Sequence, residues 1–220
     1  MSSAAVTAET TAAVVFDFGG VVFNWRPVDL IQSLLPHLAN TPEAAADLAQ
    51  RVFQSFVPGS DWSEFDRGAL HADEVTARIA VRTGLPQDDL FALLEAIPAH
   101  LAPVPGTVDW LNRLADAGVR LHFLSNMPRP YAEYLLREHA FLARFQSGVF
   151  SCEVGQVKPH VAIFETATQR FGLPPQHCVF IDDHPTNVEV ACQLGWRAVQ
   201  FVDAPQCEQA LQERGWLPSS

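Results

Sequence analysis

The stretch AVVFDFGGVV, residues 13–22, decides the fold, because a single carboxylate interrupts an apolar run just before two glycines. A short unbroken apolar run is typical of a strand that is buried on both faces of a sheet. Such a strand would end by presenting Asp17, and the backbone after it would carry no side chain at two positions. The stretch therefore predicts a site built around Asp17. It also raises the question of what Gly19 replaces or makes room for.

The composition is that of a folded globular protein, with 220 residues, 48% hydrophobic residues and 18% charged residues. No apolar run reaches the roughly 18 residues that a membrane span needs, so we expect no membrane partner. Residues 1–12 lack the basic and apolar segments of a signal peptide, and we expect a disordered tail there. The four cysteines show no metal-binding spacing. Reduced, buried thiols and a cytoplasmic location are therefore expected, rather than a metal site or disulfides.

The balance of charges indicates which partners are excluded. A net charge of −11 argues against nucleic acid, whose phosphates need a basic face. Of the 14 basic residues, 13 are arginines, and the one lysine is Lys158. A chain that uses arginine everywhere else indicates that arginine could not do the work of Lys158. The partner we expect is a small molecule, and the sequence does not indicate the oligomeric state.

Short apolar segments alternate with amphipathic segments after residue 104. Strands are expected at 119–126, 178–183 and 198–203, and helices at 109–118, 130–141, 161–173 and 187–196. This alternation predicts an α/β protein with a Rossmann-like parallel sheet and helices on both of its faces. The catalytic core would consist of residues 13–25 and 104–220.

Residues 26–103 differ, because they contain proline-punctuated helical patterns and no convincing strand. They predict an all-helical cap inserted after the first strand. The proline cluster at 98–106 is expected to be the linker that returns the chain to the core.

Polar residues cluster where the predicted sheet presents its carboxyl edge. They are Asp17, Ser125, Asn126, Lys158, Asp182 and Asp183. Because ligands bind at this edge of open parallel sheets, we expect these residues to converge. Three neighbouring carboxylates repel one another unless a proton or a cation lies between them, and hard oxygen ligands suit Mg²⁺. A metal, a lysine, small donors and a free carboxylate are the parts needed for phosphoryl transfer to an aspartate.

Four motifs carry a resemblance to a known family. They are VVFDFGGVVF (14–23), LHFLSN (121–126), GQVKP (155–159) and VFIDDHPTN (179–187). In this order they resemble the sequence motifs of the haloacid dehalogenase superfamily. The match covers most of the chain, on both sides of the insertion. It implies a Rossmann-like sheet with a helical cap inserted after the first motif.

The resemblance also implies a role for each motif residue. Asp17 would be the nucleophile that forms an aspartyl-phosphate. The carbonyl of Gly19 and the carboxylate of Asp183 would bind Mg²⁺, with Asp182 as a further ligand or a holder of water. The residues implied to hold the phosphoryl group are Ser125, Asn126, Lys158 and Asn187.

One position departs from the pattern. Most phosphatases of this superfamily carry an aspartate, their general acid and base, two residues after the nucleophile, and here that residue is Gly19. Dehalogenases of the superfamily lack it too, so a 2-haloacid dehalogenase is the alternative, although Asp182 and Asp183 match the acidic pair of metal-dependent members. The D-x-G-G-V pattern and FDRGALHADEV (65–75) resemble phosphatases acting on sugar 1-phosphates such as α-glucose 1-phosphate. We therefore predict a Mg²⁺-dependent phosphatase acting on a small, sugar phosphate-like monoester.

The missing acid leaves further hypotheses open. The protein could be a pseudo-enzyme that binds phosphorylated ligands without turnover. His184 could supply the proton or be a solvated loop histidine, and without a replacement acid we expect a preference for good leaving groups. In the cap, a cluster of residues either faces substrate or forms a helix end: Trp62, Phe65, Asp66 and Arg67. From this cluster we take Trp62 and Arg67 as substrate candidates.

Overall fold

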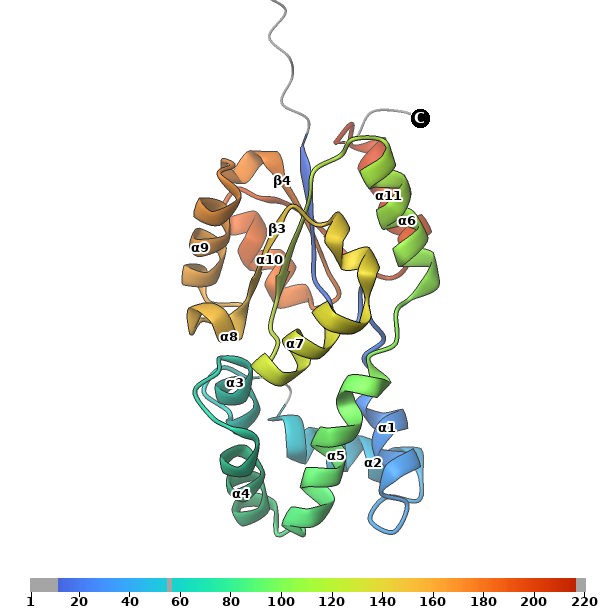
Figure 1. Ribbon diagram of the computed structural model, residues 1–220, viewed down its shortest axis with the longest axis vertical. Coiled ribbons are helices and arrows are strands. Elements are labelled where there is room, and N and C mark those ends of the chain that lie inside the picture. Colours follow the sequence, from blue (N-terminus) through green and yellow to red (C-terminus); the bar gives the residue numbers. More distant parts are fainter. Residues whose placement is uncertain (1–11, 55–56, 217–220) are drawn as a thin grey trace, which may run out of the picture.

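The computed structural model describes residues 12–54 and 57–216. Within them, a sheet of five parallel strands has the order β3-β2-β1-β4-β5, with β1 at its centre (Figure 1). The strands are β1 (Ala13–Phe16), β2 (Leu121–Ser125), β3 (Ser147–Phe150), β4 (Cys178–Asp182) and β5 (Arg197–Gln200). The predicted α/β class and parallel sheet are confirmed.

Helices cover both faces of the sheet, as predicted (Figure 1). Along β1, Val14 and Phe16 point into one hydrophobic core, while Ala13 and Val15 point into the other. The first core is closed by α6 (Pro105–Asp116), α7 (Arg129–Glu138) and α11 (Ala204–Glu213), and the second by α9 (Val161–Phe171) and α10 (Pro185–Gln193). Three short helices complete this part: η2 (Ala140–Arg144), α8 (Ser151–Val154) and η3 (Pro175–His177). Burial on both faces explains why the strands read as continuous apolar runs.

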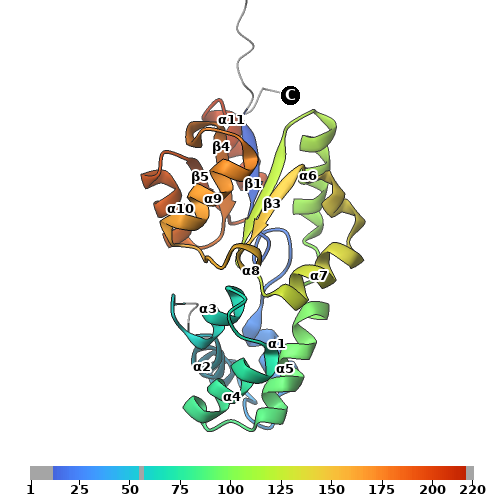
Figure 2. The ribbon, with the colours of Figure 1, turned by 60° about the vertical axis from the view of Figure 1, so that its left-hand side comes forward.

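Between β1 and α6 the chain forms helices, and we call these helices the cap. They are α1 (Pro27–Leu34), α2 (Pro42–Phe53), α3 (Asp61–Asp66), α4 (Ala72–Thr83) and α5 (Gln87–His100). The described part of 26–103 contains no strand. In both ribbon views the cap lies beyond the carboxyl ends of the strands (Figure 2). The boundaries at residues 26 and 103 stay a proposal.

The two connections between cap and core run side by side. The backbone N–H of Asn24 donates to the carbonyl of Ala102 at 2.8 Å, and the N–H of Val104 donates to the carbonyl of Val22 at 2.8 Å. The return linker is shorter than the proline cluster predicted, because Pro98 lies inside α5 and Pro105 begins α6. The chain therefore enters and leaves the cap at one place.

Two remaining expectations concern the chain end and the thiols. The predicted tail lies outside the described residues except for Ala12, which is buried. The cysteines are free, and all are buried except Cys192. Within the described ranges, no helix is long and apolar enough to span a bilayer.

Candidate active site

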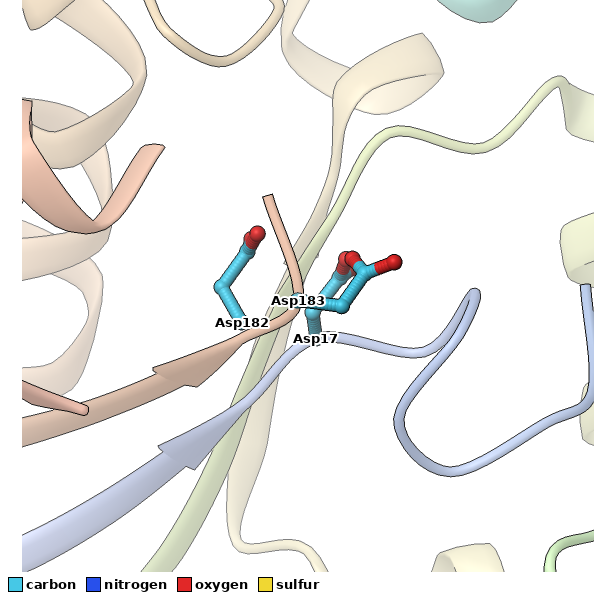
Figure 3. A group of neighbouring side chains, drawn as sticks. All are labelled: Asp17, Asp182 and Asp183. Carbon is cyan, nitrogen blue, oxygen red and sulfur yellow. The ribbon is translucent and has the colours of Figure 1, made fainter. Parts of the chain in front are cut away.

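The strand order brings the predicted polar residues to one edge of the sheet. Asp17 directly follows β1, Ser125 ends β2 and Asp182 ends β4, and β1 pairs with both of the other strands. The carboxylates of Asp17, Asp182 and Asp183 lie just beyond the ends of β1 and β4 (Figure 3). Parallel strands thus place side chains that are more than 100 residues apart in sequence at a single site.

Lys158 lies at the centre of this group, with a side chain that is only 2% exposed. Its Nζ is 2.9 Å from Oδ1 of Asp17 and 2.6 Å from Oδ2 of Asp182. The Asn126 side chain fixes the backbone of Lys158, because its Oδ1 accepts from the N–H at 2.8 Å and its Nδ2 donates to the carbonyl at 3.0 Å. The amide that was predicted to hold the phosphoryl group therefore positions the lysine.

The Asp182 carboxylate is fully buried and saturated with hydrogen bonds. Besides Lys158, the backbone N–H of His184 donates to Oδ1 at 2.8 Å, and Nδ2 of Asn187 donates to both oxygens at 3.0 and 3.1 Å. A carboxylate has about four lone-pair sites, and these contacts occupy them. Asp182 thus anchors Lys158 and Asn187, and in Figure 3 its carboxylate turns away from that of Asp183.

The two glycines after Asp17 have different consequences. Gly20 has a φ of +75°, and a Cβ there would overlap the Asp183 carboxylate, so Gly20 makes room for Asp183. Gly19 has no such constraint. The nearest atom to a Cβ at position 19 would be Cβ of Trp25 at 3.9 Å, an ordinary contact. Gly19 therefore leaves space at the position where the motif resemblance implies an acid.

The carboxylates form a set that a divalent cation could occupy. One oxygen from each of Asp17, Asp182 and Asp183 lies within 4.8 Å of the others. Oδ1 of Asp17 already accepts from the N–H of Phe18 at 2.7 Å and contacts Lys158. Within the described residues, Oδ2 of Asp17 has no hydrogen-bond partner, so Asp17 and Asp183 have oxygen atoms to offer. Oxygen-only ligands of this kind fit Mg²⁺.

Burial dominates the electrostatics of the site. Desolvation raises the pKa of Asp17 to about 7, against the attraction of Lys158 and with help from the charges of Asp182 and Asp183. Burial and the neighbouring charge of Asp182 also raise the pKa of Asp183. Burial lowers the pKa of Lys158, but the two carboxylates beside it outweigh that effect and leave it raised, so its ammonium stays charged. A concentrated negative charge held against one cation is suited to bind another cation.

A cavity of about 150 Å³ lies between the sheet edge and the cap. The core contributes Asp17, Gly19, Asn126, Lys158, Asp183 and Asn187. The cap side and the chain beside it contribute mainly apolar groups: Trp25, Trp62, Ile97 and Leu101, joined by Met127 and Tyr131 of the core. Asp66, the last residue of α3, is the one carboxyl that the described residues of the cap add to this lining.

Not every predicted residue lies in the cavity. Ser125 is buried at the end of β2 and does not line it, whereas Trp62 and His184 do. Arg67 lies elsewhere. It follows the last turn of α3, where its guanidinium pairs with Glu64, and it lines a neighbouring groove instead. Sequence reasoning could not separate Trp62 from Arg67, because helical phase near the end of a six-residue helix is poorly defined.

Comparison with known proteins agrees with this geometry. The model of one family, the haloacid dehalogenase-like hydrolases, matches residues 11–195. The chain belongs to this family. The haloacid dehalogenase-like fold accounts for the parallel sheet, and the four motifs, which the match spans, meet at its carboxyl edge.

Relatives of this haloacid dehalogenase-like protein include phosphatases and dehalogenases. A sesquiterpene phosphatase of Aspergillus oryzae is 24% identical over 195 residues, which are 89% of this chain and 92% of the relative. An (S)-2-haloacid dehalogenase of Pseudomonas putida is 25% identical over 97 residues, 44% of this chain and 43% of the relative.

A solved structure supports the fold. A haloacid dehalogenase family enzyme of Bacteroides thetaiotaomicron, in complex with magnesium and inorganic phosphate, aligns with a TM-score of 0.65. It is 20% identical, and the alignment covers 86% of this chain and 93% of that one. At this identity the likeness establishes the fold of the haloacid dehalogenase-like chain.

Proposed function

We propose that this hydrolase is a Mg²⁺-dependent phosphatase that cleaves phosphate monoesters through an aspartyl-phosphate on Asp17. The observation that carries the proposal is the contact of Lys158 with Asp17, beside a second carboxylate, Asp183, for which the described residues form no ion pair. A dehalogenase needs no metal, so a surplus of carboxylates would only oppose its reaction. The phosphatases among the relatives support the same choice.

The residues of the chain would divide the work as follows. The carboxylate of Asp17 would attack phosphorus through one oxygen and leave the other for Mg²⁺, and its contacts with the N–H of Phe18 and with Lys158 orient it. The ammonium of Lys158 offsets negative charge on both reactants, and attack of one anion on another is opposed without it. Asn126 holds the backbone of Lys158 in place, and Asp182, itself held by Asn187, accepts from its ammonium.

Bound Mg²⁺ would supply further positive charge to the phosphoryl oxygens. Asp17, Asp183 and the carbonyl of Gly19 are the groups we propose to hold it. Asp182 fits the role of anchor better than that of ligand, since its lone pairs are already used.

The organic part of the substrate would contact the apolar lining. Trp25, Trp62, Ile97 and Leu101 offer few hydrogen-bonding groups to a sugar. The volume of about 150 Å³ is close to the size of a cavity that holds one benzene ring. We therefore propose a small apolar alcohol or phenol as the leaving group, in place of the sugar that the subgroup resemblance predicts. Free thiols support a reducing, cytoplasmic location as part of the same proposal.

The test measures product release from benzyl phosphate, 4-nitrophenyl phosphate and glucose 1-phosphate with Mg²⁺, and halide release from 2-chloropropionate. Phosphate release that stops with a chelator and returns with Mg²⁺ is expected. Asp183→Asn should raise the Mg²⁺ concentration needed for half-maximal activity by at least about 10–100-fold, the loss that removal of even an outer-shell partner causes. The matched control is Asp47→Asn, which alters an exposed aspartate of α2.

Other outcomes separate the remaining hypotheses. Halide release in the presence of chelator would make the protein a dehalogenase. Binding of phosphate esters without any turnover would identify a pseudo-enzyme. Faster hydrolysis of glucose 1-phosphate than of benzyl phosphate would contradict an apolar substrate and restore the sugar prediction.

A further inference from the structure

The proposed reaction needs a proton for the leaving oxygen and then a base for the attacking water. Position 19 supplies neither, because it is glycine. Asp66 lies across the same cavity, which it lines together with Asp17, Gly19 and Lys158. The residue is only 4% exposed, and its carboxyl has no hydrogen-bond or ion-pair partner among the described residues. Its carboxyl lines the cavity and is engaged by no described protein group, so it is available for chemistry there.

The backbone around Asp66 is held against the core. Oγ of Ser151, at the start of α8, donates to the carbonyl of Asp66 at 2.5 Å and accepts from the N–H of Met127 at 2.8 Å. Two residues later, Gly68 has a φ of +76°, and a Cβ there would lie 3.0 Å from the carbonyl oxygen of Cys152. The end of α3 is thus packed on the segment that follows β3. These contacts fix the backbone of Asp66 on the core, beside the cavity that its side chain lines.

The protonation state of the Asp66 carboxyl suits a proton donor. Burial raises the pKa of Asp66 well above its usual value, and the negative charge of Asp17 raises it further, while Lys158 opposes both. The carboxyl is therefore protonated under conditions in which an ordinary aspartate is not. A group that begins the reaction protonated can donate first and accept afterwards.

We propose that Asp66 is the general acid and general base of the reaction, acting from the cap in place of the side chain that position 19 lacks. This role rests on the proposed phosphatase function. In the first step Asp17 forms a bond to phosphorus, the ester P–O bond breaks, and the leaving oxygen takes the proton of Asp66. In the second step the Asp66 carboxylate takes a proton from water, whose oxygen bonds to phosphorus while the bond to Asp17 breaks. Alcohol and phosphate leave, and both aspartates regain their first states.

Two other groups of the cavity are weaker candidates. The hydroxyl of Tyr131 donates to the carbonyl of Leu94 at 3.0 Å, and burial raises its pKa well above the usual value. Its proton is therefore already committed. His184 is exposed at the mouth of the cavity, next to Asp183. It is the rival that the experiment has to exclude.

The experiment compares two aromatic esters that differ in the basicity of the leaving oxygen. For Asp66→Asn, kcat/KM for benzyl phosphate should fall about 10²–10⁴-fold, because its alkoxide needs a proton. For 4-nitrophenyl phosphate, kcat/KM should change less than tenfold, because the phenolate leaves unaided. The variant should release one equivalent of 4-nitrophenolate rapidly and then stall, with phosphate on Asp17 detected by mass spectrometry.

A second variant distinguishes the loss of the acid from a structural disturbance caused by the Asp66→Asn substitution. Gly19→Asp in the Asp66→Asn background should restore benzyl phosphate hydrolysis at least tenfold, since a Cβ at position 19 meets only ordinary contacts. Asp47→Asn is the control for the loss of one cap carboxylate. Unfolding midpoints are measured for every variant.

Three results would overturn the role of Asp66. They are an equal loss of kcat/KM for both esters, unchanged rates, and the selective loss of benzyl phosphate hydrolysis in His184→Gln instead. An inactive wild type differs from all three, because then the phosphatase function fails together with this role. An active wild type with an unselective Asp66→Asn leaves the function intact and removes only Asp66 from it.

Discussion

The cavity has two walls that hold their side chains in different ways. The core wall is the edge of the sheet with Asp17, Lys158 and Asp183, and the cap wall carries Trp62, Ile97 and Leu101. On the core wall, charged groups position one another, with the Nζ of Lys158 at 2.9 Å from Asp17 and 2.6 Å from Asp182. On the cap wall, aromatic rings pack edge to face, with Trp62 at 4.6 Å from Phe53 between ring centroids. Charge geometry depends on exact positions, whereas apolar packing tolerates changes of shape if the volume is kept. The core wall is thus suited to chemistry that is fixed, and the cap wall to recognition that can vary.

The largest effect on activity should follow from replacing Lys158 on the core wall. Lys158→Ala should lower kcat/KM about 10²–10³-fold, comparable with the loss of one oxyanion-type donor. Lys158→Arg should rescue little, because a planar fork does not fit a site built for a point charge between two carboxylates. Rates are measured with 4-nitrophenyl phosphate, beside the unfolding midpoint.

The control for this prediction is Arg78→Ala, which removes an exposed cation of α4. It should leave kcat/KM unchanged. Near-normal activity of Lys158→Arg would show that the single lysine of the chain has no special function.

An intermediate effect should follow from changing the cap wall. Trp62→Leu should raise KM for benzyl phosphate about tenfold, since losing roughly 60 Å² of apolar contact at about 25 cal/mol/Å² amounts to about 1.5 kcal/mol. It should alter kcat little, because Trp62 lies opposite the charged groups. Arg67→Gln is the matched control, five residues further along the chain and outside the cavity. If Arg67→Gln raised KM and Trp62→Leu did not, recognition would have to come from the neighbouring groove.

The smallest effect on activity, with its consequence in stability instead, concerns a buried group of the sheet that takes no part in the site. His122 on β2 bonds to Oγ of Ser147 at 2.8 Å and stacks on Phe171, and burial lowers its pKa to about 4. Below pH 6.5 the unfolded chain binds a proton that the folded chain does not. The stability due to neutral His122 is therefore complete above pH 6.5 and is lost as the pH falls toward 4. The loss is up to about 3 kcal/mol.

Denaturant unfolding between pH 7 and 4 measures this dependence. His122→Phe should flatten it, while the exposed His160→Gln should not. An unchanged slope in His122→Phe would assign the acid sensitivity to other groups. Activity at pH 7 should be the same in both variants, which would separate the stability of the sheet from the chemistry at its edge.

The core wall could be predicted from the sequence and the cap wall could not, for a physical reason. Asp17 and Asp182 each follow an unbroken apolar run, and the ends of parallel strands meet by geometry alone. No such rule relates a cap helix to the sheet. Asp66 was one member of a cluster that could equally form a helix end, and its position in the cavity lining, which the folded structure shows, selects it.

Two further elements, β3 and α11, were not predicted, for different reasons. β3 is short, and its Gly148 is required because a side chain there would overlap the ring of Phe123, a contact made only in the folded sheet. By contrast, α11 carried a signal that could have been used. Asp203 caps it by accepting from the N–H of Gln206 at 2.8 Å, and Pro205 follows in the first turn.

The paired connections between cap and core have a consequence for protein engineering. Asn24 and Val104 tie the outgoing and returning chains together at the backbone, so these bonds do not depend on particular side chains. A segment of different length and sequence could be exchanged between them without altering the catalytic edge, as modular antibody loops are exchanged on a constant framework. A chimera with a foreign cap should keep its nucleophile and change its substrate. If Asp66 has the role proposed here, the transplanted segment must bring its own acid, or the core must regain one at position 19.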